Sequence, residues 1–228
     1  MHLVILLSIF LVVSCGKAAN PEGDQLVQKS SMESQGYYRA PFVLINKSLS
    51  KGVSGRGSFF INPIQFYAKV NLTTPWRDIT HIQMLHAGNR CPDRKDDINA
   101  DGYVDGMETM SASGKGILPL DYNIRSRTGK FTVYPVSDPE GKYVYSQATS
   151  TTTLMYDLRT AARTGPLDFM GRLEKNEELT LDQRVVIVYG VPETEYLPST
   201  VKGFEGFPPH MSLPIACGKF VETDEVFP

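Results

Sequence analysis

The sequence predicts an all-β sandwich or barrel with one short helix and an inserted acidic loop. Many short segments are rich in aromatic and β-branched residues, and Gly, Pro and Asp turns separate them. Clear helical periodicity is confined to one segment. The 228 residues are 41 % hydrophobic and 21 % charged, with a formal net charge of −2, which suits one globular domain. The scattered Lys and Arg residues argue against nucleic acid as a partner, because that partner requires a strongly basic face.

The first fourteen residues, 1–14, are predicted to be a signal peptide. They are almost wholly apolar, too short to span a bilayer and of the length of a signal-peptide core. The run Val12-Val-Ser-Cys15 resembles the lipobox of bacterial lipoproteins, although no Lys or Arg precedes it. This resemblance implies that the signal is cut before Cys15 and that Cys15 is then acylated. The alternative is that the apolar run is a buried strand.

Residues 15–36 are predicted to be a lipidated flexible tether, because they are polar, small and without periodicity. A single β-sandwich domain is expected over 37–228. Acylation of Cys15 implies a bacterial cell-envelope protein whose partner is the lipid membrane, with a further envelope partner unknown. Gly16, rather than Asp, follows the cysteine and favours the outer membrane.

The chain has three cysteines, an odd number for an exported protein. If Cys15 carries lipid, Cys91 and Cys217 remain as one pair in an oxidising compartment. A bond between them would close about 126 residues of chain and contribute roughly 4–5 kcal/mol on the loop-entropy model.

The first strands are expected before the acidic loop. Residues 37–49 include a long apolar run and are expected to hold the first strand. The glycine-rich residues 51–58 are expected to be a loop, since they lack the strand-to-helix junction of a phosphate-binding loop. Residues 59–61 and 65–72 show aromatic enrichment and partial alternation, so both predict strands.

More strands are expected on both sides of the acidic loop. Residues 79–86 predict a strand that leads into the loop, and 116–120 predict another strand after it. The segment 130–136 predicts a strand, and a turn at 138–141 is expected to pair 142–146 back against it.

The end of the chain is expected to contain the helix and two further strands. Residues 150–162 predict the helix, with Leu154 and Leu158 on one face. Residues 181–191 predict a central strand that is apolar on both faces, and 212–220 predict the last strand.

The acidic loop has the ligand spacing of a twelve-residue EF-hand calcium loop. Oxygen-bearing residues occupy relative positions 1, 3, 5, 7, 9 and 12: Asp97, Asn99, Asp101, Tyr103, Asp105 and Glu108. Gly102 stands at position 6, where such a loop turns sharply. Ca²⁺ takes six to eight oxygens, so this set would bind one ion through side chains, the Tyr103 carbonyl and a bidentate Glu108. The alternative is a solvated acidic turn, since Asp, Asn and Gly are ordinary turn residues.

Three segments carry a resemblance to Cu/Zn superoxide dismutases. Pro214-Ile-Ala-Cys-Gly-Lys219 resembles the terminal Leu-Ala-Cys-Gly-Val-Ile strand of that family, and Arg184-Val-Val-Ile-Val-Tyr189 resembles its Arg-x-Val-Val-Val-His strand. Residues 79–88, with Cys91 just after them, resemble the His-x-His copper strand. The resemblance spans roughly 58–220, and the related chordin-type CHRD domains are comparably similar. It implies a superoxide-dismutase-like Greek-key sandwich and a disulfide between Cys91 and Cys217.

The metal ligands of that family are largely missing. His86 matches the second histidine of His-x-His, but Met84 stands at the first and Tyr189 at the copper histidine of the Val-rich strand. Only His81, His86 and His210 follow Cys15, whereas the family needs six histidines for both metals. The calcium-type loop occupies the stretch that should carry the zinc histidines.

The sequence therefore predicts a calcium-binding, non-enzymatic cell-envelope lipoprotein with a degenerate superoxide-dismutase-like domain. The alternative is a copper-binding or redox protein that uses Met84 and His86, with Tyr189 nearby. Met84 and His86 are two apart and share a strand face, and a thioether with an imidazole suits Cu(I). Such a pair is more often packing plus a hydrogen-bonded imidazole. No nucleophile motif of a hydrolase is present, and superoxide dismutation is not expected.

Overall fold

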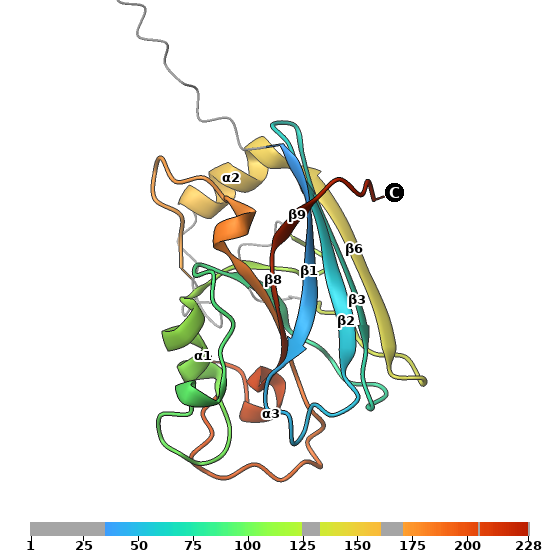
Figure 1. Ribbon diagram of the computed structural model, residues 1–228, viewed down its shortest axis with the longest axis vertical. Helices are drawn as coiled ribbons and strands as arrows, with labels where there is room; N and C mark the ends of the chain where they lie inside the picture. Colours follow the sequence, from blue (N-terminus) through green and yellow to red (C-terminus); the bar gives the residue numbers. More distant parts are fainter. Residues whose placement is uncertain (1–34, 125–132, 161–170, 205, 228) are drawn as a thin grey trace, which may run out of the picture. The chain divides into compact units, whose positions relative to one another are not determined.

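The computed structural model describes residues 35–124, 133–160, 171–204 and 206–227, and Figure 1 shows their arrangement. The predicted signal peptide, the lipidation site Cys15 and nearly all of the predicted tether lie outside these residues. The same holds for the start of the strand predicted over 130–136 and for the end of the helix predicted over 150–162.

Within the described residues the chain forms nine strands, and every paired couple is antiparallel. The strands are β1 (Gly36–Leu44), β2 (Ser54–Ile61), β3 (Gln65–Thr73), β4 (Gln83–His86), β5 (Gly116–Pro119), β6 (Lys142–Ser150), β7 (Val185–Tyr189), β8 (Pro214–Lys219) and β9 (Val221–Thr223). Their order is β5-β4-β7-β8-β1-β2-β3-β6, and β9 pairs with β1. The predicted all-β sandwich or barrel is confirmed.

Strand β1 belongs to both halves of the curled sheet. Its residues 36–41 pair with β2, while residues 42–44 pair with β8 on the other side. In Figure 1, β1 runs from β9 and β2 at one end towards β8 at the other. Because one strand serves both halves, the sheet folds over and encloses a core between them.

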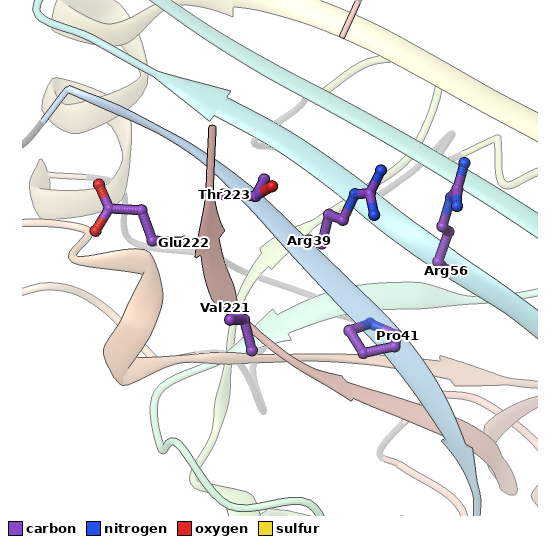
Figure 2. Close-up of a pocket in the computed structure, with 6 residues that line it drawn as sticks. All are labelled: Arg39, Pro41, Arg56, Val221, Glu222 and Thr223. Atoms are coloured by element: carbon purple, nitrogen blue, oxygen red, sulfur yellow. The ribbon is translucent and has the colours of Figure 1, made fainter. Parts of the chain in front are cut away.

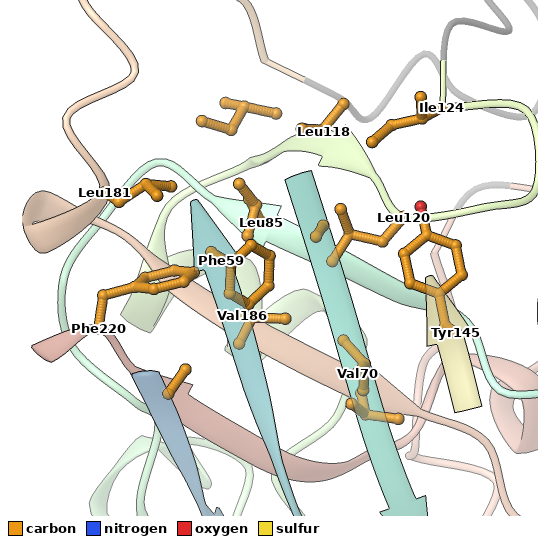
Figure 3. Packing of buried hydrophobic residues seen from close by; sticks show 14 of the residues in the cluster. Phe59, Val70, Leu85, Leu118, Leu120, Ile124, Tyr145, Leu181, Val186 and Phe220 are labelled. Carbon is orange, nitrogen blue, oxygen red and sulfur yellow. The ribbon is translucent and has the colours of Figure 1, made fainter. Parts of the chain in front are cut away.

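The main core fills the space between the two halves of the sheet. Phe59 and Tyr145 from one half meet Leu85 and Val186 from the other half in a single apolar cluster (Figure 3). Strand β3 buries alternate residues, the pattern of a strand with one face on a core and one towards solvent. Strand β7 is buried at all five positions, as the sequence predicts for a central strand.

The helices include the predicted one and two that the sequence does not predict. Helix α2 (Thr151–Thr160) matches the expected helix and buries Leu154 and Leu158. The unexpected helices are α1 (Gly106–Ser113), which directly follows the acidic loop, and the four-residue α3 (Pro209–Ser212). Two 3₁₀ turns, η1 (Arg94–Asp96) and η2 (Leu181–Gln183), complete the set among the described residues. The prediction of a single short helix is therefore wrong.

The glycine-rich segment 51–58 is a strand over much of its length rather than a loop. Strand β2 begins at Ser54 and pairs with β3 along all eight of its residues. Gly55 has φ +155, and a Cβ there would lie 2.2 Å from the Asn71 carbonyl oxygen. The glycine thus allows β2 to approach β3 closely, which is a strand role that composition alone does not reveal.

Strand β6 does not pair with residues 133–136, the described part of the strand predicted over 130–136, contrary to the prediction. It pairs along its whole length with β3, from Lys142 opposite Thr73 to Ser150 opposite Gln65. The predicted turn exists, with the Gly141 amide donating to the Asp138 carbonyl at 2.9 Å. The end of this turn is hydrogen-bonded to the residue after β3, since the Thr74 amide donates to the Gly141 carbonyl at 2.6 Å. The strand predicted over 79–86 is also shorter, since only a bridge between Thr80 and Val136 precedes β4.

Candidate metal centre

The acidic loop occupies residues 97–108 and runs from η1 into α1. Two of its residues adopt positive φ, Ala100 at 57° and Gly102 at 93°. A Cβ added at Gly102 would meet nothing within 4 Å, so the conformation rather than crowding favours glycine there. The sharp turn expected at position 6 is therefore present.

Carboxylates at the two ends of the loop accept hydrogen bonds from backbone amides of the loop. Asp97 accepts from the Asp101 amide at 3.1 Å and from the Gly102 amide at 2.9 Å. Glu108, from α1, reaches back to accept from the Ile98 amide at 2.8 Å with Oε1 and from the Asp105 amide at 3.0 Å with Oε2. The first and twelfth positions thus close the loop from opposite sides.

Asp105 connects the loop to α1 and to a distant segment. Its Oδ1 accepts from the Met107 and Glu108 amides and caps α1, and Glu108 completes a capping box. Its Oδ2 accepts from the Lys202 amide at 2.7 Å. The Gly106 amide in turn donates to the Lys202 carbonyl at 3.2 Å. Residue 105 is buried, so this carboxylate ties three pieces of chain together away from water.

The middle of the loop contains a carboxylate oxygen without a hydrogen-bond partner. Asn99 accepts from the Asp101 amide, and Asp101 accepts from the Tyr103 amide through Oδ1, both at 3.0 Å. Asp101 Oδ2 is buried and finds no partner among the described residues. A buried carboxylate oxygen is costly unless a donor or a cation satisfies it. This atom is the strongest structural indication that a cation belongs in the loop.

The donor set fits calcium in chemistry but is not gathered into a cage. The loop offers carboxylate, amide and carbonyl oxygens, the ligands that Ca²⁺ prefers. None of its four carboxylates forms an ion pair within the described part of the chain. However, no three His, Cys, Asp or Glu side chains of the described residues converge tightly enough to hold a metal as they stand. Binding would therefore exchange some of the backbone N–H contacts for contacts to the ion.

A side chain that the sequence does not indicate clamps the loop to the sheet. Asn46 donates from Nδ2 to the Val104 carbonyl at 2.9 Å, and the Val104 amide donates to Asn46 Oδ1 at 2.8 Å. The same Nδ2 donates to the Pro214 carbonyl, at the start of β8, at 2.9 Å. Asn46 has a φ of 51°, a conformation that Asn adopts more readily than most residues. An Asn directly after a strand is an ordinary turn residue, so sequence offers no signal for this role.

Val104, at position 8 of the loop, packs into a second apolar cluster on the other face of β4, β7 and β8. The cluster combines sheet residues with residues beside the loop: Ile45, Ile82, Met84, Val104, Tyr134, Val185, Ile187, Tyr189, Phe204 and Cys217. This second cluster explains why β7 is buried on both faces. It also places the acidic loop directly over a hydrophobic layer.

The residues of the copper alternative lie in or beside this second cluster. Met84 and Tyr189 are fully buried members of it. His86 Nδ1 lies 2.7 Å from the Gly114 carbonyl, and its Nε2 lies 2.6 Å from the Tyr189 hydroxyl. Because a carbonyl can only accept, Nδ1 carries the proton, and Nε2 accepts from the tyrosine. Both ring nitrogens are therefore engaged, and burial lowers the pKa of His86 to about 4.

The other two histidines have separate surroundings. His81 is buried, stacks on Tyr143 and places Nδ1 3.1 Å from the Tyr189 carbonyl. Burial lowers its pKa to about 4 as well, outweighing the contact to that carbonyl. His210 lies in α3, and its Nε2 is 2.7 Å from the Glu195 carbonyl.

The predicted disulfide between Cys91 and Cys217 is confirmed, with 5.7 Å between the two Cα atoms. It joins the segment before η1 to the middle of β8 across 126 positions of sequence. Cys217 lies in the second cluster and Cys91 packs against it. The disulfide and the Asn46 clamp therefore fasten the loop region to β8 at two points.

Comparison with protein-family models and with curated protein sequences finds no match for this chain. The resemblance to superoxide dismutases thus stays a prediction that depends on the quoted residues. Among the described residues, no helix has the length and apolar character needed to cross a membrane.

Proposed function

We propose that this chain is a calcium-binding, non-enzymatic module of the bacterial cell envelope, anchored by lipid at Cys15. The observation that carries the calcium assignment is the partnerless, buried Asp101 Oδ2, in a loop with an oxygen-bearing residue at each ligand position. The envelope assignment depends on the lipobox-like run and on the confirmed disulfide, since disulfides persist in oxidising compartments.

Calcium would act as a structural cross-link in this proposal. It would neutralise four carboxylates that repel one another, Asp97, Asp101, Asp105 and Glu108. Asp105 and Glu108 belong to the start of α1, and the Asp105 carboxylate also holds the Lys202 amide. An ion shared by these groups would fix the loop, the helix and the 202 segment over the second cluster. Extracellular calcium modules bind at roughly 10⁻⁴–10⁻³ M, which suits a stabilising role in a calcium-rich medium.

Isothermal titration calorimetry on the full chain in detergent micelles tests the proposal. We expect one calcium per chain with a dissociation constant of about 10⁻⁴–10⁻³ M, and weaker binding of magnesium, which demands stricter octahedral geometry. Glu108→Gln should weaken calcium binding at least about tenfold, because it removes charge from the bidentate position. Asp182→Asn, an exposed carboxylate in η2, is the matched control and should leave binding unchanged. Equal binding by the wild type and Glu108→Gln would refute the loop as the site.

The copper or redox alternative has less support. Its three residues lie close together, but the His86–Tyr189 hydrogen bond engages the imidazole nitrogen that could otherwise bind copper. Copper would have to break that bond inside a fully buried cluster. The arrangement is that of a hydrogen-bonded structural histidine, so calcium remains the proposed ligand.

A further inference from the structure

A hollow of about 360 Å³ lies beside β9, on the face of the sheet that points away from the main core. Figure 2 shows the six residues that line it: Arg39, Pro41, Arg56, Val221, Glu222 and Thr223. They come from β1, β2 and β9, so the floor of the hollow is rigid hydrogen-bonded sheet.

The strand register places both arginines on this same face. Arg39 pairs with Ser58, and Pro41 pairs with Arg56, across the antiparallel β1–β2 ladder. Residues two apart on a strand share a face, so Arg39 and Arg56 are diagonal neighbours. In Figure 2 the two side chains extend in the same direction from adjacent strands. The hollow forms because β9 pairs with β1 only at Tyr37–Arg39, which leaves Pro41 uncovered.

The hollow contains one arginine whose charge is not paired by any described residue. Arg56 is exposed and has no ion pair within the described part of the chain. Arg39 Nε is buried and finds no hydrogen-bond partner among the described residues. The one acidic residue of the lining, Glu222, points away from both arginines in Figure 2. Its backbone pairs with that of Tyr38, whose side chain is buried in the core.

A carboxylate from the chain itself already pairs with one of the two arginines. Glu225, just after β9, forms an ion pair with Arg39. Two residues later Phe227 sets its ring edge-on to Tyr37, with 5.6 Å between ring centroids. Tyr37 stands two residues before Arg39 on the same face of β1, so the segment 225–227 contacts two side chains of that face. The segment thus presents an acidic side chain to an arginine and an aromatic ring to an aromatic ring.

We propose that the hollow binds an acidic peptide segment of a partner protein, in which a carboxylate precedes an aromatic residue by two positions. The chain's own Glu225 and Phe227 then act as an internal competitor for the same groups. Arginine binds carboxylates through paired N–H donors, and the open Arg56 supplies a second guanidinium that Glu225 does not use. A partner peptide that engages both arginines would displace the internal segment. This site is separate from the calcium loop and does not depend on it.

The test measures fluorescence anisotropy of a labelled peptide, Thr-Asp-Glu-Val-Phe, which repeats the sequence of residues 223–227. The protein is the full chain in detergent micelles. Glu225→Gln removes the internal carboxylate, so we expect this variant to bind the peptide at least about tenfold more tightly than the wild type. Adding Arg56→Gln to Glu225→Gln should weaken peptide binding, because the peptide then meets one guanidinium instead of two. Adding Lys142→Gln instead removes one exposed charge from β6, two strands away from β2, and should preserve the gain.

Two outcomes would overturn the proposal. One is that the Glu225→Gln variant fails to bind the peptide, or binds it equally well with and without Arg56. The other is that this variant binds a polyuronate chain but not the peptide, which would assign the hollow to acidic sugars instead. A peptide with Gln in place of Glu must bind at least about tenfold more weakly, because the carboxylate is the group recognised.

Discussion

Replacing Asp101 by Asn should separate calcium binding from folding. Asp101 uses one carboxylate oxygen to accept from the Tyr103 amide, and its other oxygen is buried without a partner. An asparagine can keep the first contact and place its NH₂ group at the second position. The calcium-free fold should therefore lose little stability, whereas the ion would lose a charged ligand. Substituting Asp105 is a poorer test, because its carboxylate also caps α1 and holds the Lys202 amide.

The size of the effect follows from linkage. With a dissociation constant of about 10⁻⁴–10⁻³ M, calcium at about 10 mM stabilises the folded chain by about 1.4–2.7 kcal/mol. For a chain of this size each kcal/mol corresponds to roughly 2–4 °C, so the melting temperature should rise by about 3–11 °C. If Asp101→Asn weakens binding about tenfold, the stabilisation falls to about 0.4–1.4 kcal/mol, or roughly 1–6 °C.

Thermal unfolding followed by circular dichroism, with calcium or with a chelator, measures these shifts. The wild type and Asp101→Asn should melt within a degree or so of each other in chelator and diverge only in calcium. Asp182→Asn controls for the loss of one exposed carboxylate and should retain the full calcium shift. Identical calcium shifts in the wild type and Asp101→Asn would refute the assignment of Asp101 as a ligand. The absence of any shift in the wild type would refute calcium binding altogether.

Four further predictions concern the disulfide, the anchor, copper and pH. Replacing Cys91 and Cys217 by Ser should lower the free energy of unfolding in urea by up to roughly 4–5 kcal/mol, since the bond closes a long loop. Cys15→Ser should move the protein from the membrane fraction to the soluble fraction or stall its processing, because acyl chains supply the attachment; a processed variant that stays membrane-bound contradicts this. A copper-reconstituted sample should consume superoxide no faster than its His86→Ala variant, and a clear excess would show a working copper site. The free energy of unfolding in urea should decrease as pH falls from 6.5 towards 4. In this range His81 and His86 take up protons in the unfolded chain but stay neutral in the folded chain, where their pKa values are about 4. The expected slope is about 1.4 kcal/mol per pH unit for each histidine, and substitution of either one should reduce it.

The strands could be predicted because their patterns report directly on burial. Strand β3 alternates buried and half-exposed residues, which indicates a strand with one face on the core. Strand β7 is an unbroken apolar run, which indicates a strand buried on both faces. The helix α2 has two buried leucines one turn apart, and their spacing in the sequence indicates which face is buried. The sharp turn of the acidic loop could also be predicted, from the glycine at position 6 of the calcium-loop spacing, while calcium binding itself stays a prediction.

The pairing of strands could not be predicted, because it depends on contacts distant in sequence. Strand β6 follows a turn that suits a local hairpin, yet it pairs with β3, whose residues lie 69 to 85 positions earlier along the chain. The eight residues of α1 have little helical periodicity and are held in place by the Asp105 cap. The one signal for α1 in the sequence is the Asp105-x-x-Glu108 spacing, which is that of a capping box.

The parts of the site that join the loop to the sheet were also hidden from the sequence. Asn46 contacts Val104, 58 positions away, and Pro214, 168 positions away, through one amide group. The Lys202 contact to Asp105 uses only the backbone N–H of residue 202, so any residue except proline could make it. The burial of Asp101 Oδ2 without a partner arises only in the folded chain, so the spacing of residues cannot predict it. Sequence therefore indicates which residues could bind an ion, and structure indicates what the ion would stabilise.

The disulfide, the Asn46 clamp and a bound calcium ion would reinforce one another. The disulfide fixes the segment before the loop to β8, and the Asn46 clamp fixes the loop itself to the first residue of β8. Both attachments restrain the loop in the unbound chain, so less conformational entropy would remain to be lost when an ion binds. Conversely, an ion that draws Asp105 and Glu108 together would hold Val104 in the second cluster, next to Cys217. Calcium, disulfide and clamp would then restrain the same small region, and loss of any one of them should weaken the other two.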